Sequence, residues 1–334
     1  MSEKIINKNN LLSNIAFLKA KSGCLKFCAV VKANAYGHDL EKIVPVIENS
    51  VDYFAVATFE EALAVKKLEK TRPILVLSPC FCPKIENQIE LTVASVNDVL
   101  ELEKQKKKVF VHLKINTGMN RFGAGLEEIR KILEKIRTSK FVILKGVFTH
   151  FHSAENRQLL EAQKKKFEKI LSSIELTDGI IVHYSNTTAT LAGTGGDMCR
   201  CGIGIYGFGH KNLKPVLEIK SKIAAIQNVE AGDFVGYSGG FIAKKKIKVG
   251  VVKIGYADGF LREFNFGSVC VKDRACKIIG NVCMDCLFCD LSKVQNAKIG
   301  DDVLVIWKNN NIQKIGKKTK KISYEILCGF NCLR

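Results

Sequence analysis

The chain has 334 residues, of which 47% are hydrophobic and 25% are charged, and its formal net charge is +19. This length and apolar content favour a folded protein of two domains and exclude a disordered or low-complexity chain. No run reaches the roughly 18 apolar residues of a membrane span. The sequence therefore predicts a cytoplasmic protein with no membrane partner.

The positive charge comes mostly from lysines in helix-like segments such as EKQKKKVF at 103–110 and EAQKKKFEKI at 161–170. Such runs are typical of solvated helix faces. Because no zinc-finger spacing and no aromatic RNA-binding signature accompanies them, we expect no nucleic-acid partner.

From about residue 26 to residue 206, short β-rich runs alternate with longer helical patterns, which is typical of repeated βα units. Eight parallel strands with intervening helices predict a (β/α)8 TIM-like barrel over residues 1–215. The eight predicted strands are KFCAVVK (26–32), DYFAVAT (52–58), PILVL (73–77), LTVAS (91–95), VFVHLKI (109–115), FVILKGVFTH (141–150), GIIVHY (179–184) and RCGIGIYG (200–207).

After about residue 215 the pattern changes to short strands with turn residues between them and little helical periodicity. This pattern predicts a second, mostly β domain over residues 216–334. The predicted strands lie in LEIKSKIAAIQNV (217–229), IKVGVVKIGY (247–256), GSVCVKD (267–273), CKIIGNVCM (276–284) and DDVLVIW (301–307).

In barrels of this kind the functional groups follow the carboxyl ends of the strands. The first run ends at Lys32, and a lysine there is either an exposed strand-end residue or a Schiff-base lysine whose pKa is lowered by burial. The sixth run ends at His150, and the eighth begins at Arg200. These positions favour a catalytic site over an accidental cluster.

Phosphate sites in such barrels often lie after the seventh and eighth strands. There, Asn186 and Thr187 offer side-chain donors, and Gly202 and Ile203 offer backbone N–H groups. A phosphate-bearing carbonyl cofactor beside a strand-end lysine fits pyridoxal 5'-phosphate (PLP).

The thirteen cysteines are expected to be reduced thiols. Cys283, Cys286 and Cys289 have part of an iron–sulfur spacing, but the fourth cysteine and the proline of that motif are missing. Their apolar stretch has the pattern of strands, so we expect buried, inert thiols. His150 and His152 form an H-x-H pair without an evident third ligand, and we predict no metal.

Motifs in order along the chain are similar to those of alanine racemases, the PLP-dependent enzymes of fold type III. VVKANAYGH at 30–38 resembles their cofactor-lysine motif. The other matching motifs are HLKINTGMNRFG (112–123), VFTHFHSAE (147–155), HYSNTTATL (183–191), MCRCGIGIYG (198–207), KIGYADGF (253–260), NVCMDCLFCDL (281–291) and ISYEIL (322–327).

The resemblance implies that Lys32 forms the internal aldimine with PLP and is one of two catalytic bases. It implies that Tyr256, from a second subunit, is the other base. Arg200 would face the pyridine nitrogen, which it cannot protonate as an acid would. The resemblance implies that Arg121 donates to the phenolic oxygen of PLP and that His150 packs beside the PLP ring. The phosphate ligands implied are Tyr36, Thr187, Gly202, Ile203 and Tyr324.

By the same resemblance, Met284 and Asp285 of the partner chain, with Arg121, would bind the substrate alanine. Lys114 matches a position that can be carbamylated, which would convert a cation that repels Arg121 into an anion that orients it. We expect Arg200 and His183 to be cations near the bases. A shared site requires a homodimer, and D-alanine would supply peptidoglycan in a bacterium.

Two other activities stay open. A broader-specificity PLP racemase would differ in pocket width, and a fold-related PLP decarboxylase would use Cys283 or Cys286. Cys201 and Asn281 depart from the family pattern, which commonly has proline and arginine there, and this puts loop geometry and dimer contacts in question. His112 and His210 are expected to be structural.

Overall fold

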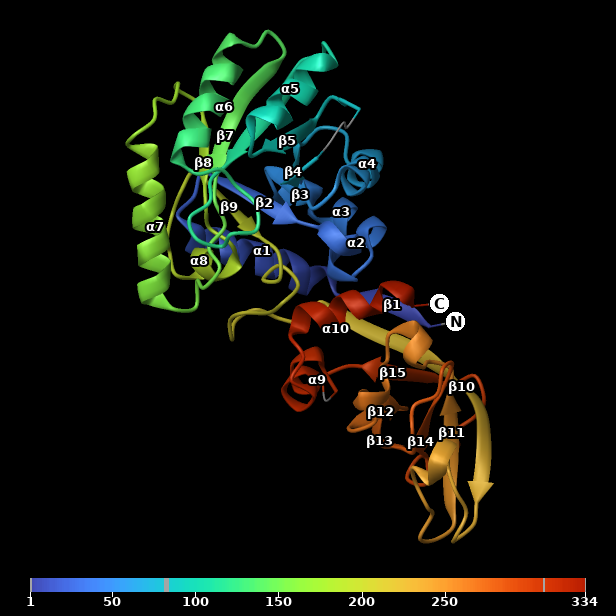
Figure 1. Cartoon of the computed structure of the whole chain (residues 1–334). Helices are drawn as coiled ribbons and strands as arrows, with labels where there is room; N and C mark the ends of the chain where they lie inside the picture. Colours follow the sequence, from blue (N-terminus) through green and yellow to red (C-terminus); the bar gives the residue numbers. More distant parts are fainter. Residues whose placement is uncertain (1, 81–83, 309, 334) are drawn as a thin grey trace. The chain divides into compact units, whose positions relative to one another are not determined.

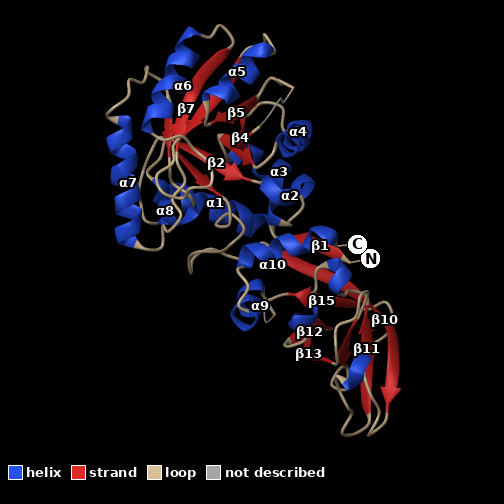
Figure 2. Ribbon diagram, in the orientation of Figure 1, coloured by secondary structure: helices blue, strands red, loops and turns tan. Residues whose placement is uncertain are grey.

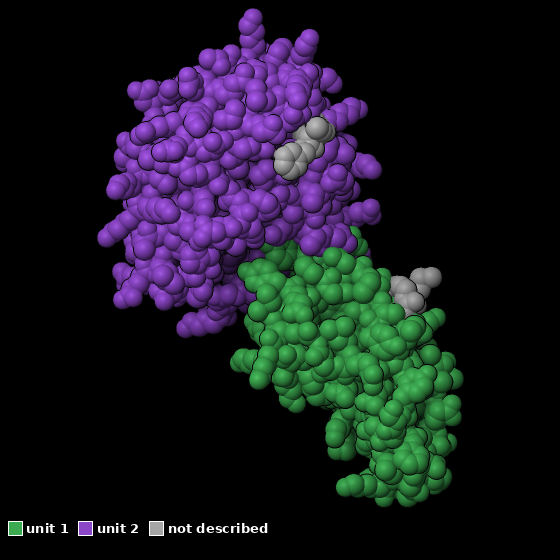
Figure 3. Space-filling model, in the orientation of Figure 1, with its two compact units in different colours: residues 1–7, 36–39, 216–334 green, residues 8–35, 40–215 purple. Residues whose placement is uncertain are grey.

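The computed structural model describes residues 2–80, 84–308 and 310–333. The chain divides into two compact units, shown in Figure 3. The barrel unit contains residues 8–35 and 40–215, and the β unit contains residues 1–7, 36–39 and 216–334. This division departs from the expected single cut at residue 215, because the first strand of the chain pairs with a strand of the β unit.

The barrel unit is built on eight parallel strands in the order β8-β7-β6-β5-β4-β3-β2-β9. Backbone hydrogen bonds from Asp197 N to Val182 O and from Arg200 N to Ser185 O, both 2.8 Å long, join the last strand to β8 and close the ring. The strands are β2 (Lys26–Val30), β3 (Tyr53–Val56), β4 (Ile74–Pro79), β5 (Ile89–Val93), β6 (Val109–Lys114), β7 (Val142–Phe148), β8 (Ile181–His183) and β9 (Met198–Cys201).

The eight predicted strands are therefore confirmed, although several of their boundaries differ by one or two residues and that of the last strand by more. The last strand begins at Met198 and ends at Cys201, and the predicted continuation through residue 207 is a series of turns. The glycines at 202, 204 and 207 favour turns over a ladder, which explains the early end.

Helices surround the strands of the barrel unit, as Figures 1 and 2 show. Their apolar residues recur every three or four positions. In α6 the buried set is Ile129, Ile132, Leu133 and Ile136, which lie on one helix face. The helices are α1 (Lys8–Ser22), α3 (Leu40–Ile47), α4 (Phe59–Leu68), α5 (Val96–Lys104), α6 (Leu126–Thr138), α7 (Arg157–Leu171) and α8 (Thr187–Leu191), with a short turn, α2 (Lys32–Tyr36), after the first barrel strand.

The β unit is an antiparallel sheet in the order β1-β10-β11-β14-β13-β12-β15, and an additional pairing of β10 with β15 closes it. The long strand β10 makes this possible because different parts of it pair with β1, β15 and β11. The strands are β1 (Glu3–Ile6), β10 (Leu217–Val229), β11 (Ile247–Val252), β12 (Ser268–Val271), β13 (Arg274–Ile279), β14 (Leu287–Asp290) and β15 (Asp302–Ile306).

Two features of the β unit differ from expectation. Its last residues form helices α9 (Ile312–Thr319) and α10 (Ser323–Gly329). Cys283 and Cys286 lie on the loop between β13 and β14, whereas the third cysteine of this cluster, Cys289, lies on β14. The prediction that this whole stretch is strand was wrong, because the chain turns at Gly280 (φ 67°).

Within the described residues, no helix combines the length and apolar character needed to cross a bilayer. The twelve cysteines in the described ranges are all free thiols. Cys82 lies outside those ranges.

Candidate active site

Lys32 lies where β2 ends, on a turn with unusual backbone geometry. Residues 33–36 all have positive φ, between 52° and 55°, so α2 is a left-handed turn of four non-glycine residues. Each residue in this conformation costs about 1–2 kcal/mol. Strain of this kind concentrates at functional sites and needs support from its surroundings.

Hydrogen bonds inside the barrel unit supply this support. Glu61 of α4 accepts from Ala33 N through Oε1 at 2.7 Å and from Ala57 N through Oε2 at 2.7 Å. Asn34 Oδ1 accepts from Leu40 N at 2.7 Å, and Ala35 N donates to Val31 O at 2.8 Å. The turn after Lys32 is therefore held by one distant side chain, Glu61, and by two local hydrogen bonds within and just after the motif.

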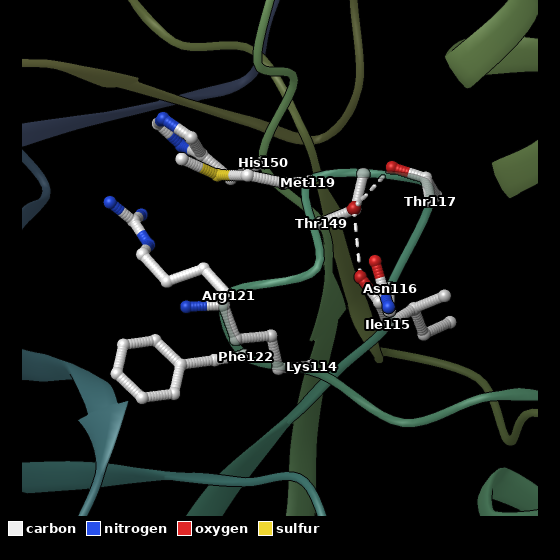
Figure 4. A pocket seen from close by; sticks show the side chains of 9 residues that line it. All are labelled: Lys114, Ile115, Asn116, Thr117, Met119, Arg121, Phe122, Thr149 and His150. Atoms are coloured by element: carbon white, nitrogen blue, oxygen red, sulfur yellow. Dashed lines mark hydrogen bonds between the residues drawn. The ribbon is translucent and has the colours of Figure 1, made fainter.

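Lys114, Arg121 and His150 line one pocket at the carboxyl ends of β6 and β7. Figure 4 shows their side chains, with Phe122 and Met119, extending to the same side. Behind them, Thr149 Oγ1 donates to Ile115 O at 2.8 Å and shares a 2.8 Å hydrogen bond with Thr117 Oγ1. This pair of threonines joins the two strand ends that carry the basic groups.

The Lys114 ammonium is in an unfavourable environment. Burial, followed by the charges of Arg200, Arg121 and Lys32, lowers the pKa of Lys114 to about 7. Its Nζ donates to Leu77 O at 2.9 Å. Among the residues that the structure describes, no aspartate or glutamate forms an ion pair with it. Four basic residues therefore converge on one region of the barrel.

His150 is a neutral imidazole in this setting. Burial is the main cause that lowers its pKa to about 3, and the charges of Arg200, Arg121, Lys114 and Lys32 add to it. A neutral ring can pack beside a cofactor ring without adding a further positive charge.

Arg200 is buried inside the barrel. Its Nη1 lies 2.8 Å from His183 Nδ1, and its Nη2 donates to Thr149 O at 2.7 Å. The guanidinium carbon lies 5.2 Å from the centroid of the Phe148 ring. Burial lowers the pKa of Arg200 only to about 10, so it remains a cation at neutral pH.

The expectation that His183 is a cation was wrong. Burial, with the charges of Arg200, His112 and Lys114, holds the pKa of His183 well below its usual value. The guanidinium of Arg200 only donates, so the facing His183 Nδ1 must accept.

Thr187 and the turn after β9 form the predicted phosphate-binding region of the barrel unit. The Thr187 hydroxyl accepts from Gly202 N at 3.2 Å and from Gly204 N at 3.3 Å. Ile203 is buried between these two residues. A Cβ on Gly204 would lie 2.6 Å from Thr187 Cγ2, so the close approach requires glycine here.

Asn186 has a structural role through its side chain. Its Oδ1 accepts from Ala189 N at 3.0 Å and caps α8, and its Nδ2 donates to Phe151 O at 3.1 Å. Cys201, which departs from the family pattern, keeps its place in the ladder opposite Ala29.

In the β unit, Tyr36 and Tyr324 lie together, with ring centroids 5.9 Å apart. Tyr256, Met284 and Asp285 form a second group. Tyr256 N donates to Cys283 O, and Ala257 N donates to Met284 O, both at 3.0 Å. Tyr256 and Met284 are 37% and 53% exposed, so both side chains are accessible from outside this chain.

Sequence reasoning missed Glu61, Glu90 and the contacts of His112. His112 Nδ1 lies 2.8 Å from His183 Nε2, and its Nε2 lies 2.7 Å from Glu90 Oε2. A buried glutamate inside the run IELTV was the available signal, because a carboxylate on a buried strand needs a partner.

The residues in 2–80, 84–308 and 310–333 contain no group of three or more His, Cys, Asp or Glu that could hold a metal ion. His152 Nδ1 instead lies 2.6 Å from Ser153 Oγ.

Known proteins resemble this chain over its whole length. The model of the alanine racemase N-terminal domain matches residues 6–209, and that of the C-terminal domain matches residues 216–332. The alanine racemase of Francisella philomiragia subsp. philomiragia is 35% identical, over 98% of this chain and 96% of that protein.

Solved structures agree. The alanine racemase of Clostridium difficile 630 has a TM-score of 0.90 at 30% identity, covering 98% of this chain and 92% of that one. The enzyme from Bartonella henselae, with covalently bound pyridoxal phosphate, has a TM-score of 0.82 at 25% identity, covering 98% and 97%. These matches confirm the predicted barrel-plus-β fold and the predicted racemase activity. The chain belongs to the alanine racemase family.

Proposed function

We propose that this alanine racemase family member interconverts L- and D-alanine with PLP on Lys32, using Lys32 and Tyr256 as its two bases, and so supplies D-alanine for peptidoglycan. The observation that carries the proposal is the convergence of Lys32, Lys114, Arg121 and Arg200, whose charges act on one another inside the barrel. Such a site favours an anionic cofactor and a substrate carboxylate.

The residues of the barrel unit fit PLP. The Thr187 hydroxyl accepts from Gly202 N and Gly204 N, so its own O–H is directed outward and can donate to a phosphate. When bound, PLP supplies an electron-withdrawing ring that acidifies the α C–H bond of the amino acid. Arg200 would donate to the pyridine nitrogen and, as a permanent cation, would not hand over its proton. Arg121 would donate to the phenolic oxygen, with His150 beside the ring.

Racemisation needs one base on each face of a planar carbon. Lys32 Nζ would remove or return the α-proton on one face, and Tyr256 Oη would do so on the other. In the L-to-D direction one of these groups ends protonated and the other deprotonated, and the reverse reaction restores them. Met284 and Asp285 share a loop with backbone contacts to Tyr256, so they would bind on the tyrosine side.

Tyr256 would come from a second copy of the chain. The β unit exposes large apolar side chains near it: Tyr237 and Met284, which are 71% and 53% exposed, line a cavity of about 460 Å³ together with Asp285. Phe234 and Ile242 are exposed on the adjoining segment. Exposed apolar groups of this kind mark protein interfaces. They support a homodimer with shared sites.

We further propose that Lys114 is carbamylated. Carbon dioxide adds to the neutral amine, forming an N–C bond and releasing one proton, and a pKa of about 7 leaves a large neutral fraction of Lys114 at neutral pH. The product would place an anion beside Arg121 and reduce the repulsion among the four basic residues. Labelling with 13C-bicarbonate tests this: one carbamate carbon signal is expected, and its persistence in Lys114→Met would contradict the assignment.

Complementation between two inactive variants tests the two bases and the dimer together. Lys32→Ala and Tyr256→Phe should each lack racemase activity. When equal amounts are unfolded, mixed and refolded, half of the dimers are mixed and each has one intact site, so about a quarter of the wild-type activity should return.

No recovery, with mixed dimers shown by mass spectrometry, would mean that each site is built within one chain. Undiminished activity of Tyr256→Phe would show that Tyr256 is not a catalytic base. A separate assay of D-serine against D-alanine formation distinguishes an alanine-specific enzyme from a broader racemase.

A further inference from the structure

A chain of buried hydrogen bonds crosses the interior of the barrel from Glu90 to Arg200. Its three links are Glu90 Oε2 to His112 Nε2 at 2.7 Å, His112 Nδ1 to His183 Nε2 at 2.8 Å, and His183 Nδ1 to Arg200 Nη1 at 2.8 Å. All four side chains belong to residues that are no more than 5% exposed. Glu90 is on β5 and Arg200 on β9, which lie opposite each other in the ring of strands.

The chemistry of the groups determines the position of each proton. Arg200 can only donate, so His183 Nδ1 accepts and the His183 proton is on Nε2. That proton points to His112 Nδ1, which must accept, so the His112 proton is on Nε2. An ionised Glu90 has only acceptors and receives it. Both histidines are therefore neutral, and every link donates in the direction from Arg200 to Glu90.

We propose that Glu90 is a positioning residue for Arg200, acting through His112 and His183. The proposal rests on the proposed role of Arg200 beside the cofactor. If His112 instead donated to His183, the His183 proton would move to Nδ1 and face the Arg200 N–H. A carboxylate at the other end prevents this reversal, because it cannot donate to His112 Nε2.

Packing restricts the imidazole rings of His112 and His183, which form the middle of this hydrogen-bond chain. The Phe148 ring stacks on His183 with centroids 4.8 Å apart and planes 6° from parallel. A Cβ on Gly146 would lie 2.3 Å from His112 Nδ1, so the strand leaves room for the imidazole alone. Tyr53 Oη reaches the other oxygen of Glu90 at 3.5 Å. Glu90 thus acts at the far end of a rigid path.

Histidine and arginine 15N NMR of the full-length protein, with and without PLP, tests the proposal. In the wild type we expect His112 and His183 each to show a protonated Nε2 and a bare Nδ1. In Glu90→Leu we expect mixed tautomers of His183 and at least about tenfold faster water exchange of the Arg200 N–H groups. Glu90→Gln should give a smaller effect than Glu90→Leu, because its amide can accept from His112 through the oxygen but can also donate to it through the nitrogen.

Glu69→Leu is the matched control. Glu69 is equally buried in the barrel unit but bonds to Thr71 and Arg72, so its loss should leave the Arg200 signals unchanged. The proposal is overturned if Glu90→Leu destabilises the protein as Glu69→Leu does and leaves the signals of His183 and Arg200 unchanged. It is also overturned if the wild type carries a proton on His183 Nδ1, a result that needs no variant.

In the holoenzyme, Glu90→Leu should lower kcat about tenfold or more, as loss of an outer partner of a site ligand does. KM for alanine should change little, because Arg200 would face the cofactor and not the substrate. A tenfold rise in KM with an unchanged kcat would contradict the role given to Glu90. If the wild type binds no PLP, the proposed function fails, while the NMR result without cofactor still decides the hydrogen-bond chain.

Discussion

The carboxylate of Glu61 accepts a hydrogen bond from the backbone N–H of Ala33, the residue after Lys32, at 2.7 Å. The same carboxylate completes the capping box of α4 by accepting from the N–H of Thr58. One side chain therefore ties the left-handed turn that follows Lys32 to the start of a helix.

Replacing Glu61 by alanine should lower the free energy of unfolding by about 1–3 kcal/mol, because the partly buried N–H groups of Ala33 and Ala57 lose their acceptor. The free energy of unfolding of Glu61→Gln should lie between those of the wild type and Glu61→Ala, since glutamine keeps one of the two acceptor oxygens. Urea titration measures both. Glu60→Ala, at the exposed neighbouring position, is the control. A loss in Glu61→Ala no larger than in this control would show that the turn does not depend on Glu61.

The pKa of Lys114, lowered to about 7 by burial and nearby positive charges, predicts a pH dependence of stability in carbon dioxide-free buffer. Between pH 7 and the unfolded pKa near 10.5, the unfolded chain binds more protons at Lys114, so stability rises with pH. Relative to Lys114→Met, the wild type should gain up to about 5 kcal/mol across this range, at about 1.4 kcal/mol per pKa unit. Stability curves of the two proteins that run parallel from pH 7 to pH 10 would contradict this.

Gly146→Ala should destabilise the barrel unit by about 1–3 kcal/mol, the usual cost of overpacking. The new Cβ would lie 2.3 Å from His112 Nδ1 and 2.9 Å from Ile181 O. Thermal unfolding measures the loss. Gly329→Ala is the matched control, because a Cβ on Gly329 would meet no other part of the protein within 4 Å and its φ of −58° suits alanine. Equal effects of the two substitutions would show that the strand can move to accept a methyl group.

Tyr237→Glu combined with Phe234→Glu should weaken the proposed dimer, because it puts two charges on the exposed apolar surface of the β unit. Analytical ultracentrifugation should show a monomer fraction that grows on dilution, with activity falling in parallel. Ile299→Glu changes another strongly exposed apolar side chain of the same unit and should leave the dimer intact. A fully dimeric double variant would place the interface elsewhere.

The sequence by itself determined the eight barrel strands and the motif residues at their ends. Strand patterns are local, and Lys32, Arg121, His150 and Arg200 stand within short motifs that can be read without knowing what packs against them. The β-rich character of the second half was equally clear from its alternation of short runs and turns.

Only the tertiary structure decided the contacts between distant residues. Glu90, His112, His183 and Arg200 come from four different strands, and no local pattern links them until the ring of strands closes. The same closure buries His183 against Arg200 and makes it neutral. Likewise, β1 pairs with β10 rather than with the barrel, because strand pairing depends on which edge is available in space and not on position along the chain.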